Sequence, residues 1–449
     1  MPRLFRPIAL AFIALMIALT QSFAQRVPLV RDAEIEALIK DYARPLMKAA
    51  GLRPGSVRFF IVNDDSFNAF VSRGGMYLHT GLLLQSQTPG EVIGVIAHEL
   101  GHITGGHEIR LQNRAQTARR VAQITTLLGL GLGVAGAASG DGNVAAAGQG
   151  VALGGNNIAM RGLLAYQRDE EASADRAAAT YLSKAGISGE GMLRTFKRLA
   201  EQAGLASSGR EDPYLRSHPA PRDRINALNN TLRKSKAFGK PDPASLQLRH
   251  DMMRAKIAAY SGNSRYARAV LADRSLHPNA RLYGRAIVAH LYGSAKDALP
   301  LIDKLAKSDP KNAYLQEMRG EILLRNGKGK EAAAALARAV ELDRYRAGFI
   351  RVQLGHAQLE AGGAKNVKAA ISNLRKGLAS DPYAVGGYQL LARAYGELGD
   401  RPNALLSSAE FSIRTGRKKL ARDYARRAQE SLKRGSPGWL RAQDILTLK

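Results

Sequence analysis

The sequence predicts a mainly helical protein: an α+β domain with a small sheet, followed by an all-helical solenoid of repeated helix pairs. Two observations predict this fold class. The strand-like segments that we identify lie before residue 84, among helical patterns, and beyond residue 245 helical patterns alternate with short turns. With 449 residues, of which 45% are hydrophobic, the chain can bury the cores of roughly two or three domains.

The start of the chain has the features of a cleavable export signal. Arg3 and Arg6 precede an apolar run, 8–19, and small residues follow at Ser22 and Ala24. We therefore predict cleavage after Ala24 and export from the cytoplasm. The alternative, an uncleaved anchor helix, is less favoured because the apolar run is short for a membrane span.

The chain is strongly basic, with a formal net charge of +28 and an isoelectric point of 10.4. In a cytosolic protein this charge would suggest nucleic-acid binding. Outside the cytoplasm the available polyanions are lipid head groups, lipopolysaccharide and acidic proteins, so we predict peripheral contact with an anionic membrane surface and no nucleic-acid partner. Plain solubility is the alternative. The absence of cysteine leaves histidine and carboxylate as ligands for any zinc ion.

Three short elements are expected in the first domain. Apolar residues at helical spacing predict a helix over 32–50, the β-branched run 57–63 predicts a strand, and 68–83 predicts a hairpin that turns at Gly74-Gly75. An exposed strand of this hairpin could pair with an extended substrate peptide, although an ordinary core hairpin is an equal alternative. The candidate substrate-binding residues are Asn68, Gly74, Gly75, Met76 and Tyr77.

The segment His98-Glu99-Leu100-Gly101-His102 carries the most specific chemical signal. On a helix, residues four apart lie on one face, so both imidazoles can contact one metal ion. Glu99 can reach a water bound to that ion, which is where a general base for hydrolysis must lie. This is the HExxH pattern, and the apolar run before it predicts a buried helix. Two unrelated histidines on a solvated helix are the alternative.

Residues 123–164 are rich in Gly, Ala, Leu and Val and nearly free of charge. The polar stretch 140–143 interrupts them, so we identify no unbroken apolar run long enough to span a membrane. We predict a helical flap or hairpin over the active site that touches a membrane surface. A merely flexible insertion is the alternative.

Two histidines leave a zinc ion short of a third protein ligand, and a carboxylate on a later helix is a usual source. Three acids compete for this role: Asp169, Glu170 and Glu171. Glu171 has Asp175 four residues on, on the same helical face, where its carboxylate could orient a ligating histidine.

Two further histidines need an assignment. A longer three-histidine pattern would require a ligand at residue 108, which is Glu108, so the neighbouring His107 is favoured for a structural role. His218 lies between prolines that fix an extended backbone, and it could reach the open metal position or stabilise an oxyanion. A surface histidine is the alternative for His218.

The second half has the pattern of tetratricopeptide repeats. Tyr388, Leu391, Ala392, Tyr395, Gly399 and Ala404 have the spacing of one repeat, and Asp309-Pro310 and Asp381-Pro382 lie about two repeat lengths apart. Such stacks form concave surfaces that bind protein segments; a rigid spacer is the alternative. The expected divisions are a signal peptide at 1–24, a metallopeptidase domain at 25–233, a linker at 234–245, repeats at 246–435 and a tail at 436–449.

Four segments resemble motifs of the HtpX-like zinc metallopeptidases, the family that also contains the CAAX prenyl protease. They are NAFxxxGGxxxxTGLL at 68–83, HELGH at 98–102, ExxAD at 171–175 and HPxxxxRI at 218–225. With its export signal and weakened apolar segments, the chain resembles the soluble, periplasmic BepA-like branch, which carries tetratricopeptide repeats.

The resemblance implies one zinc ion per chain, held by His98, His102 and Glu171. It also implies that Glu99 activates water, that Asp175 supports the site, and that His218 can occupy the zinc site and restrain activity.

The expected function is that of a periplasmic zinc endopeptidase and chaperone in the quality control or assembly of outer-membrane proteins. Its substrates would be unfolded or stalled outer-membrane proteins, and its repeat domain would contact the outer-membrane assembly machinery. The main alternative is a non-proteolytic periplasmic adaptor or chaperone whose zinc site is held closed by His218. A lipopolysaccharide-binding protein driven by charge is a third hypothesis.

Overall fold

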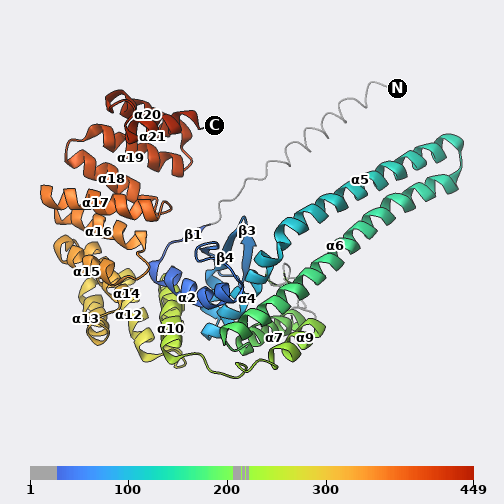
Figure 1. Ribbon diagram of the computed structural model, residues 1–449, viewed down its shortest axis with the longest axis horizontal. Coiled ribbons are helices and arrows are strands. Elements are labelled where there is room, and N and C mark those ends of the chain that lie inside the picture. Colours follow the sequence, from blue (N-terminus) through green and yellow to red (C-terminus); the bar gives the residue numbers. More distant parts are fainter. Residues whose placement is uncertain (1–27, 206–213, 215–217, 219–221, 449) are drawn as a thin grey trace.

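A computed structural model describes residues 28–205, 214, 218 and 222–448, so the expected signal peptide lies outside the described residues. A central α+β domain carries a long helical hairpin on one side and a curved stack of helix pairs on the other (Figure 1). The predicted fold class, mainly helical with a small sheet and a repeat solenoid, is confirmed.

The sheet has four strands in the order β1-β2-β4-β3. The strands are β1 (Leu29–Val30), β2 (Arg58–Val62), β3 (Ala69–Ser72) and β4 (Gly75–His79). β2 and β4 run parallel, and the two outer strands pair antiparallel with them. The strand expected at 57–63 is therefore present as β2, and β3 is an outer strand of the sheet that the described residues form.

The predicted hairpin joins β3 to β4, but its turn lies one residue earlier than Gly74-Gly75. Ser72 pairs with Gly75, so Arg73 and Gly74 form the two-residue turn. Both have positive φ, 49° and 72°, as the type I′ turn of a tight hairpin requires. Gly75 is instead the first residue of β4.

Helices pack together with the sheet to form the core of the first domain. They are α2 (Ala33–Ala49), α3 (Thr80–Gln85), α4 (Pro89–Gly105), α5 (His107–Ser139), α6 (Gly142–Ala185), α7 (Glu190–Leu205) and α9 (Arg222–Leu232). The expected helix at 32–50 is α2, and Asp32 caps it by accepting a hydrogen bond from the Ile35 amide at 2.9 Å. α4 is buried along nearly its whole length, with Val95, Ile96 and Leu100 in the core.

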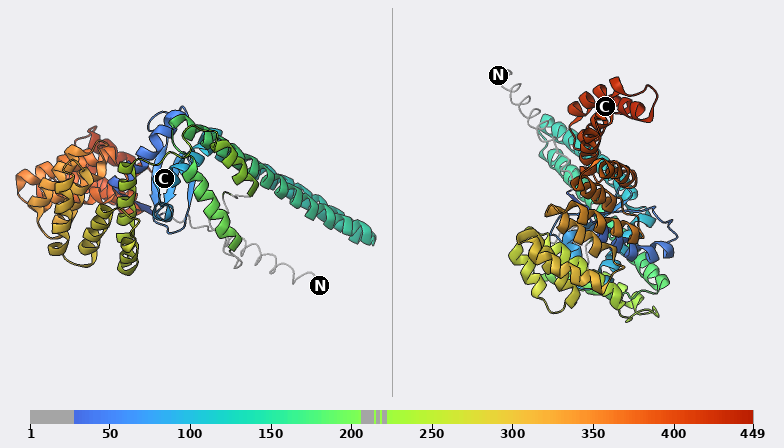
Figure 2. Two further views of the ribbon diagram at one scale, coloured as in Figure 1. Left: turned by 90° about the horizontal axis from the view of Figure 1, so that it is seen from below. Right: turned by 90° about the vertical axis from the view of Figure 1, so that its left-hand side faces the viewer.

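α5 and α6 form the helical hairpin expected around 123–164, but it does not cover the rest of the domain. The two helices are 33 and 44 residues long, and together they project away from the sheet (Figures 1 and 2). Each helix continues without a break from the domain into the hairpin, so the hairpin extends outward where a flap over the active site was expected.

The second half consists of antiparallel helix pairs that stack into a curved solenoid (Figure 1). Its helices are α10 (Ala244–Ala259), α11 (Ser264–Ala272), α12 (Pro278–Tyr292), α13 (Ala295–Ser308), α14 (Ala313–Arg325), α15 (Gly329–Leu342), α16 (Gly348–Ala361), α17 (Ala364–Ser380), α18 (Gly386–Glu397), α19 (Arg401–Arg414), α20 (Lys418–Ser431) and α21 (Pro437–Thr447). Small residues allow close pairing, since a Cβ on Gly355 would lie 2.6 Å from Leu374. The expected tail at 436–449 forms α21, which packs against α19 and α20 because Ala442 and Ile445 are buried there.

A buried polar cluster joins the two halves of the chain. The Lys256 ammonium on α10 lies 2.7 Å from Asp32 and 3.2 Å from Glu34 at the start of α2. Glu34 also accepts a hydrogen bond from the Tyr283 hydroxyl at 2.8 Å. The Lys256 side chain is only 5% exposed, so its two carboxylate partners compensate a charge that water does not reach.

We predict that Lys256→Met destabilises the full chain by about 3 kcal/mol, because it leaves two carboxylates without their buried cation. The exposed pair Arg338–Glu341 offers a control, and Arg338→Met should cost less than about 1 kcal/mol. Urea denaturation of the two variants measures the difference. Equal shifts in the denaturation midpoint would contradict the assigned role of Lys256.

Candidate functional site

Two histidines of α4 lie one above the other at the centre of the first domain. Pro89 begins this helix and Gly106, in the left-handed conformation, ends it. His98 is fully buried and His102 partly so, and their Nε2 atoms are 3.0 Å apart. The two histidines therefore lie on one face of a single helix, as predicted.

Close contact between α4 and α6 brings a carboxylate to these histidines. A Cβ on Gly101 would lie 2.7 Å from the backbone oxygen of Ala174, so only glycine allows the two helices to approach this closely. One turn before Ala174, the Glu171 carboxylate lies 3.2 Å from the Nε2 atom of His98 and 3.2 Å from that of His102.

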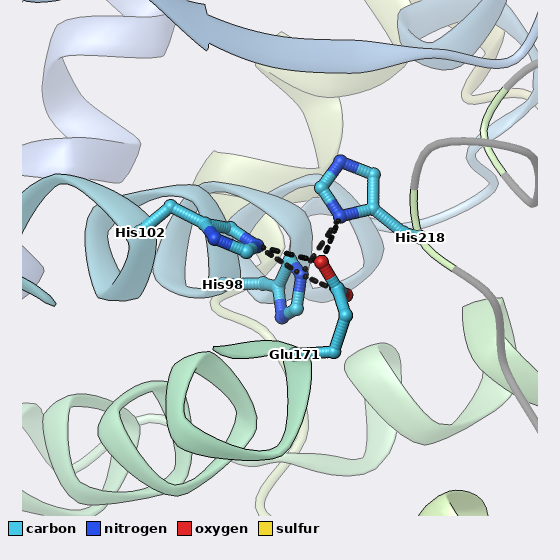
Figure 3. A group of neighbouring side chains, drawn as sticks. All are labelled: His98, His102, Glu171 and His218. Atoms are coloured by element: carbon cyan, nitrogen blue, oxygen red, sulfur yellow. Dashed lines mark hydrogen bonds and ion pairs between the residues drawn. The ribbon is translucent and has the colours of Figure 1, made fainter. Parts of the chain in front are cut away.

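His218 completes a group of four side chains (Figure 3). Its Nδ1 atom lies 3.0 Å from Glu171 Oε1 and 3.3 Å from His98 Nε2. The amide of His218 donates to the Tyr214 carbonyl at 2.7 Å, and the two rings lie 4.7 Å apart. One potential ligand atom from each of His98, His102, Glu171 and His218 lies within 4.8 Å of the others.

The chemistry of this group fits a divalent metal ion. His98 Nδ1 lies 3.0 Å from Asp175, so the imidazole donates its Nδ1 proton there, and Nε2, which faces His102, is the atom that can ligate a metal ion in place of its own proton. Two nitrogen atoms 3.0 Å apart need a proton or a cation to share. Glu99 Oε1 is buried, with no hydrogen-bond partner among the described residues. Nitrogen and carboxylate ligands without sulfur are compatible with zinc.

The pKa values of the ionisable groups at the site are shifted in different directions. Burial would raise the pKa of Glu171, but the three histidines around it outweigh burial and hold its pKa far below the usual range. Burial likewise opposes the charge of His98, yet Asp175 and Glu171 raise its pKa to about 9. Glu99 differs, because burial dominates and raises its pKa. A carboxylate with raised proton affinity is suited to accept a proton.

Arg224 on α9 is a neighbour of the site to which the sequence patterns assigned no role. Its guanidinium donates to both oxygens of Asp175 and lies 3.0 Å from Glu171 Oε2. The side chain is 8% exposed, so this buried arginine holds both carboxylates, as His98 does. The position of Arg224 in the HPxxxxRI motif, six residues after His218, was the sequence feature that could have indicated its role.

His107 lies beside the group and is not a member of it. Its Nδ1 atom is 2.8 Å from His102 Nδ1, and its Nε2 atom is 2.7 Å from Glu170. Arg110 pairs with the same carboxylate at 2.9 Å. Of the three competing acids, Glu171 therefore reaches the group, Glu170 contacts His107, and the exposed Asp169 is not part of it.

The candidate substrate-binding residues divide between an edge strand and an inner strand. Asn68 precedes the edge strand β3, and Gly74 lies in the turn. Gly75, Met76 and Tyr77 lie on β4, which is paired on both sides, and the Met76 side chain is fully buried. A peptide can therefore extend the sheet only at β3 on this side. The role of these residues in substrate binding stays a prediction.

Comparison with known proteins agrees with this geometry. Residues 30–232 match the model of Peptidase family M48. The chain is 26% identical over 419 residues to the beta-barrel assembly-enhancing protease of Escherichia coli (strain K12). The alignment covers 91% of this chain and 82% of that protein.

Two further matches cover smaller parts of the chain. A putative beta-barrel assembly-enhancing protease of Vibrio cholerae is 31% identical over 297 residues, 64% of this chain and 58% of that protein. Among solved structures, yeast Tom70 aligns with a TM-score of 0.36 and 15% identity over 66% of this chain and 64% of that one, too distant to carry any inference.

We predict that Asp175→Asn lowers zinc affinity by about 10- to 100-fold without removing a ligand, because His98 loses the acceptor that fixes its orientation. Asp169→Asn, on the exposed face of the same helix, should leave zinc affinity unchanged. Zinc titration against a competing chelator measures both. Identical affinities for the two variants would refute the role of Asp175.

Proposed function

We propose that this chain, whose residues 30–232 match the model of peptidase family M48, is a zinc-dependent endopeptidase. The observation that supports the proposal most strongly is the convergence of His98, His102 and Glu171 from two separate helices beside the buried carboxylate of Glu99. Three protein ligands with a neighbouring base form the typical arrangement of a catalytic zinc site.

In this proposal His98, His102 and Glu171 hold one zinc ion per chain. The zinc supplies a positive charge that polarises the scissile carbonyl and lowers the pKa of water. Glu99 accepts the proton of that water and passes it to the leaving amine, which suits a carboxyl whose pKa burial raises. Asp175 and Arg224 are positioning residues, since they orient His98 and Glu171.

His218 represents a closed state of the site. Its Nδ1 atom belongs to the same group as the three proposed ligands, and its Nε2 atom lies 3.6 Å from Glu99 Oε1. An imidazole there takes the place that water and the substrate carbonyl need. For catalysis His218 must move away, after which it could stabilise the oxyanion. The alternative function, a non-proteolytic adaptor or chaperone, requires His218 to remain in place.

We further propose a role in the quality control or assembly of outer-membrane proteins in the periplasm. Support comes from the E. coli protease, which matches most of the chain, including the repeats. The curved solenoid would bind unfolded or stalled outer-membrane proteins, or the machinery that assembles them, and hold them as a chaperone. The outer strand β3 would then pair with an extended segment of the substrate.

Glu99→Gln should reduce casein hydrolysis by roughly 10²- to 10⁴-fold, because the amide cannot accept the proton of water. Zinc content should stay at that of the wild-type protein, since Glu99 is not a proposed ligand. Glu190→Gln, an exposed change on α7, provides the control and should alter neither quantity. Wild-type rates of hydrolysis by the Glu99 variant would exclude the proposed base.

His218→Ala should raise casein hydrolysis several-fold, because the variant leaves the fourth ligand place to water. His356→Ala, on the repeat helix α16, should leave the rate unchanged. The adaptor hypothesis predicts no increase for either variant. Kinetics of a quenched peptide or casein substrate with equal zinc loading distinguish the two functions.

A further inference from the structure

The α5–α6 hairpin exposes an unusual amount of apolar surface. Among the described residues, 13 of the 22 exposed large hydrophobic side chains lie between residues 109 and 164. Leu127, Val134 and Ile158 are 68%, 70% and 71% exposed. Isolated exposed hydrophobic residues are ordinary, but a concentration of this kind marks a surface that is covered by something else.

The exposed apolar side chains surround α5 and do not form a single stripe. They include the consecutive or alternate positions Leu127, Leu128, Leu130, Leu132 and Val134, which point in different directions around the helix. Within 121–160 the one charged residue is Asp141, at the tip of the hairpin. A helix that lies flat on a membrane needs a polar face, whereas a helix that is apolar all round is suited to full immersion.

The hydroxyl groups in the apolar part of α5 bond to carbonyls of the same helix. The hydroxyl of Thr125 donates to the Val121 carbonyl at 3.0 Å, and that of Thr126 donates to the Ala122 carbonyl at 2.7 Å. Among the described helices, α5 alone is long and apolar enough to cross a membrane, and its most apolar part is almost entirely exposed. It is therefore not the core helix of a soluble domain.

The two helices meet through glycine and alanine. A Cβ on Gly129 would lie 2.4 Å from the Gly148 carbonyl, and a Cβ on Gly136 would lie 2.4 Å from the Ala145 nitrogen. Close backbone contact through small residues stabilises helix pairs in lipid, where burying leucine against leucine gives no advantage over the acyl chains. The apolar side chains are consequently left facing outward.

The length of the hairpin and its charges match a bilayer. The stretch 121–139 is about 28 Å long at the rise of an α-helix, close to the roughly 30 Å of the hydrocarbon core. Arg114, Arg119 and Arg120 lie exposed just before it. The antiparallel register that places Arg110 opposite Glu170 also places Arg120 level with Arg161, so arginines of both helices meet at one depth.

We propose that the α5–α6 hairpin inserts into a lipid bilayer with anionic head groups, so that its tip at 140–142 crosses to the far side and the arginines contact the near head groups. If the proposed function holds, this has a consequence for the substrate. α5 starts two residues after α4 ends, and α6 carries Glu171, so the metal site would lie about 20 Å from the membrane surface. The peptidase would then act on polypeptides held at that surface.

The absence of cysteine allows a direct test with single-cysteine variants of the full chain. Ser139→Cys labels the tip, and Gln112→Cys labels the exposed start of α5 on the near side of the arginines. After flotation with vesicles of phosphatidylethanolamine and phosphatidylglycerol, a membrane-impermeant maleimide should modify Gln112→Cys and leave Ser139→Cys protected until detergent is added. Equal labelling of the two variants in intact vesicles, or failure of the protein to float, would overturn the proposal.

A second set of variants distinguishes lipid from other occupants. Leu130→Glu with Val134→Glu should reduce the vesicle-bound fraction at least tenfold, whereas Leu440→Glu, at an exposed position of the repeat domain, should not change it. Replacing Arg119 and Arg120 by Gln should weaken binding to anionic vesicles about fivefold for each arginine. If the hairpin instead binds a second copy of the chain, the Leu130/Val134 variant would change the oligomeric state and wild-type protein would not float.

Hydrolysis of soluble casein separates this proposal from the proposed function. All these variants lie outside the metal site and should cleave casein at the wild-type rate. Loss of flotation with normal hydrolysis refutes the hairpin assignment alone, and a wild-type protein that floats but never hydrolyses casein refutes the peptidase alone.

Discussion

The close contact of α4 with α6 at Gly101 and Ala174 is the constraint on which the rest of the structure depends. It brings a carboxylate from residue 171 to two imidazoles that precede it by about seventy residues in the chain. The chain that connects the two sides of this contact, α5 and the first part of α6, leaves the domain as the projecting hairpin and returns to it (Figure 1). The same helix, α6, therefore carries both a residue of the site and one arm of the hairpin.

Much of the site could be predicted from the sequence because its histidines lie on a single helix. The spacing of His98 and His102 fixes their relation without any tertiary information. The third ligand is less predictable. The sequence pattern left Asp169 and Glu170 as alternatives to Glu171, and only the rotation of α6 against α4 shows which of these acids faces the histidines. The role of Arg224 depends on how α9 packs, which a local pattern does not contain.

The fold was predictable where periodicity is strong and less so where packing decides. The repeat helices and the first helix, capped by Asp32, follow from local spacing and capping. The last helix, α21, resembled a tail because only Ala442 and Ile445 are buried from it. The hairpin turn lies at Arg73-Gly74, one residue earlier than predicted, because the parallel pairing of Gly75 with Arg58 in β2 fixes where β4 begins.

X-ray absorption at the zinc edge tests the central claim most directly, because it counts the imidazoles bound to the metal in the intact protein. The four-residue group predicts three imidazoles and a carboxylate oxygen in the wild-type protein, and two imidazoles once His218 is replaced by alanine. A wild-type spectrum with fewer than three imidazoles, or the absence of any zinc in the purified chain, would contradict the account.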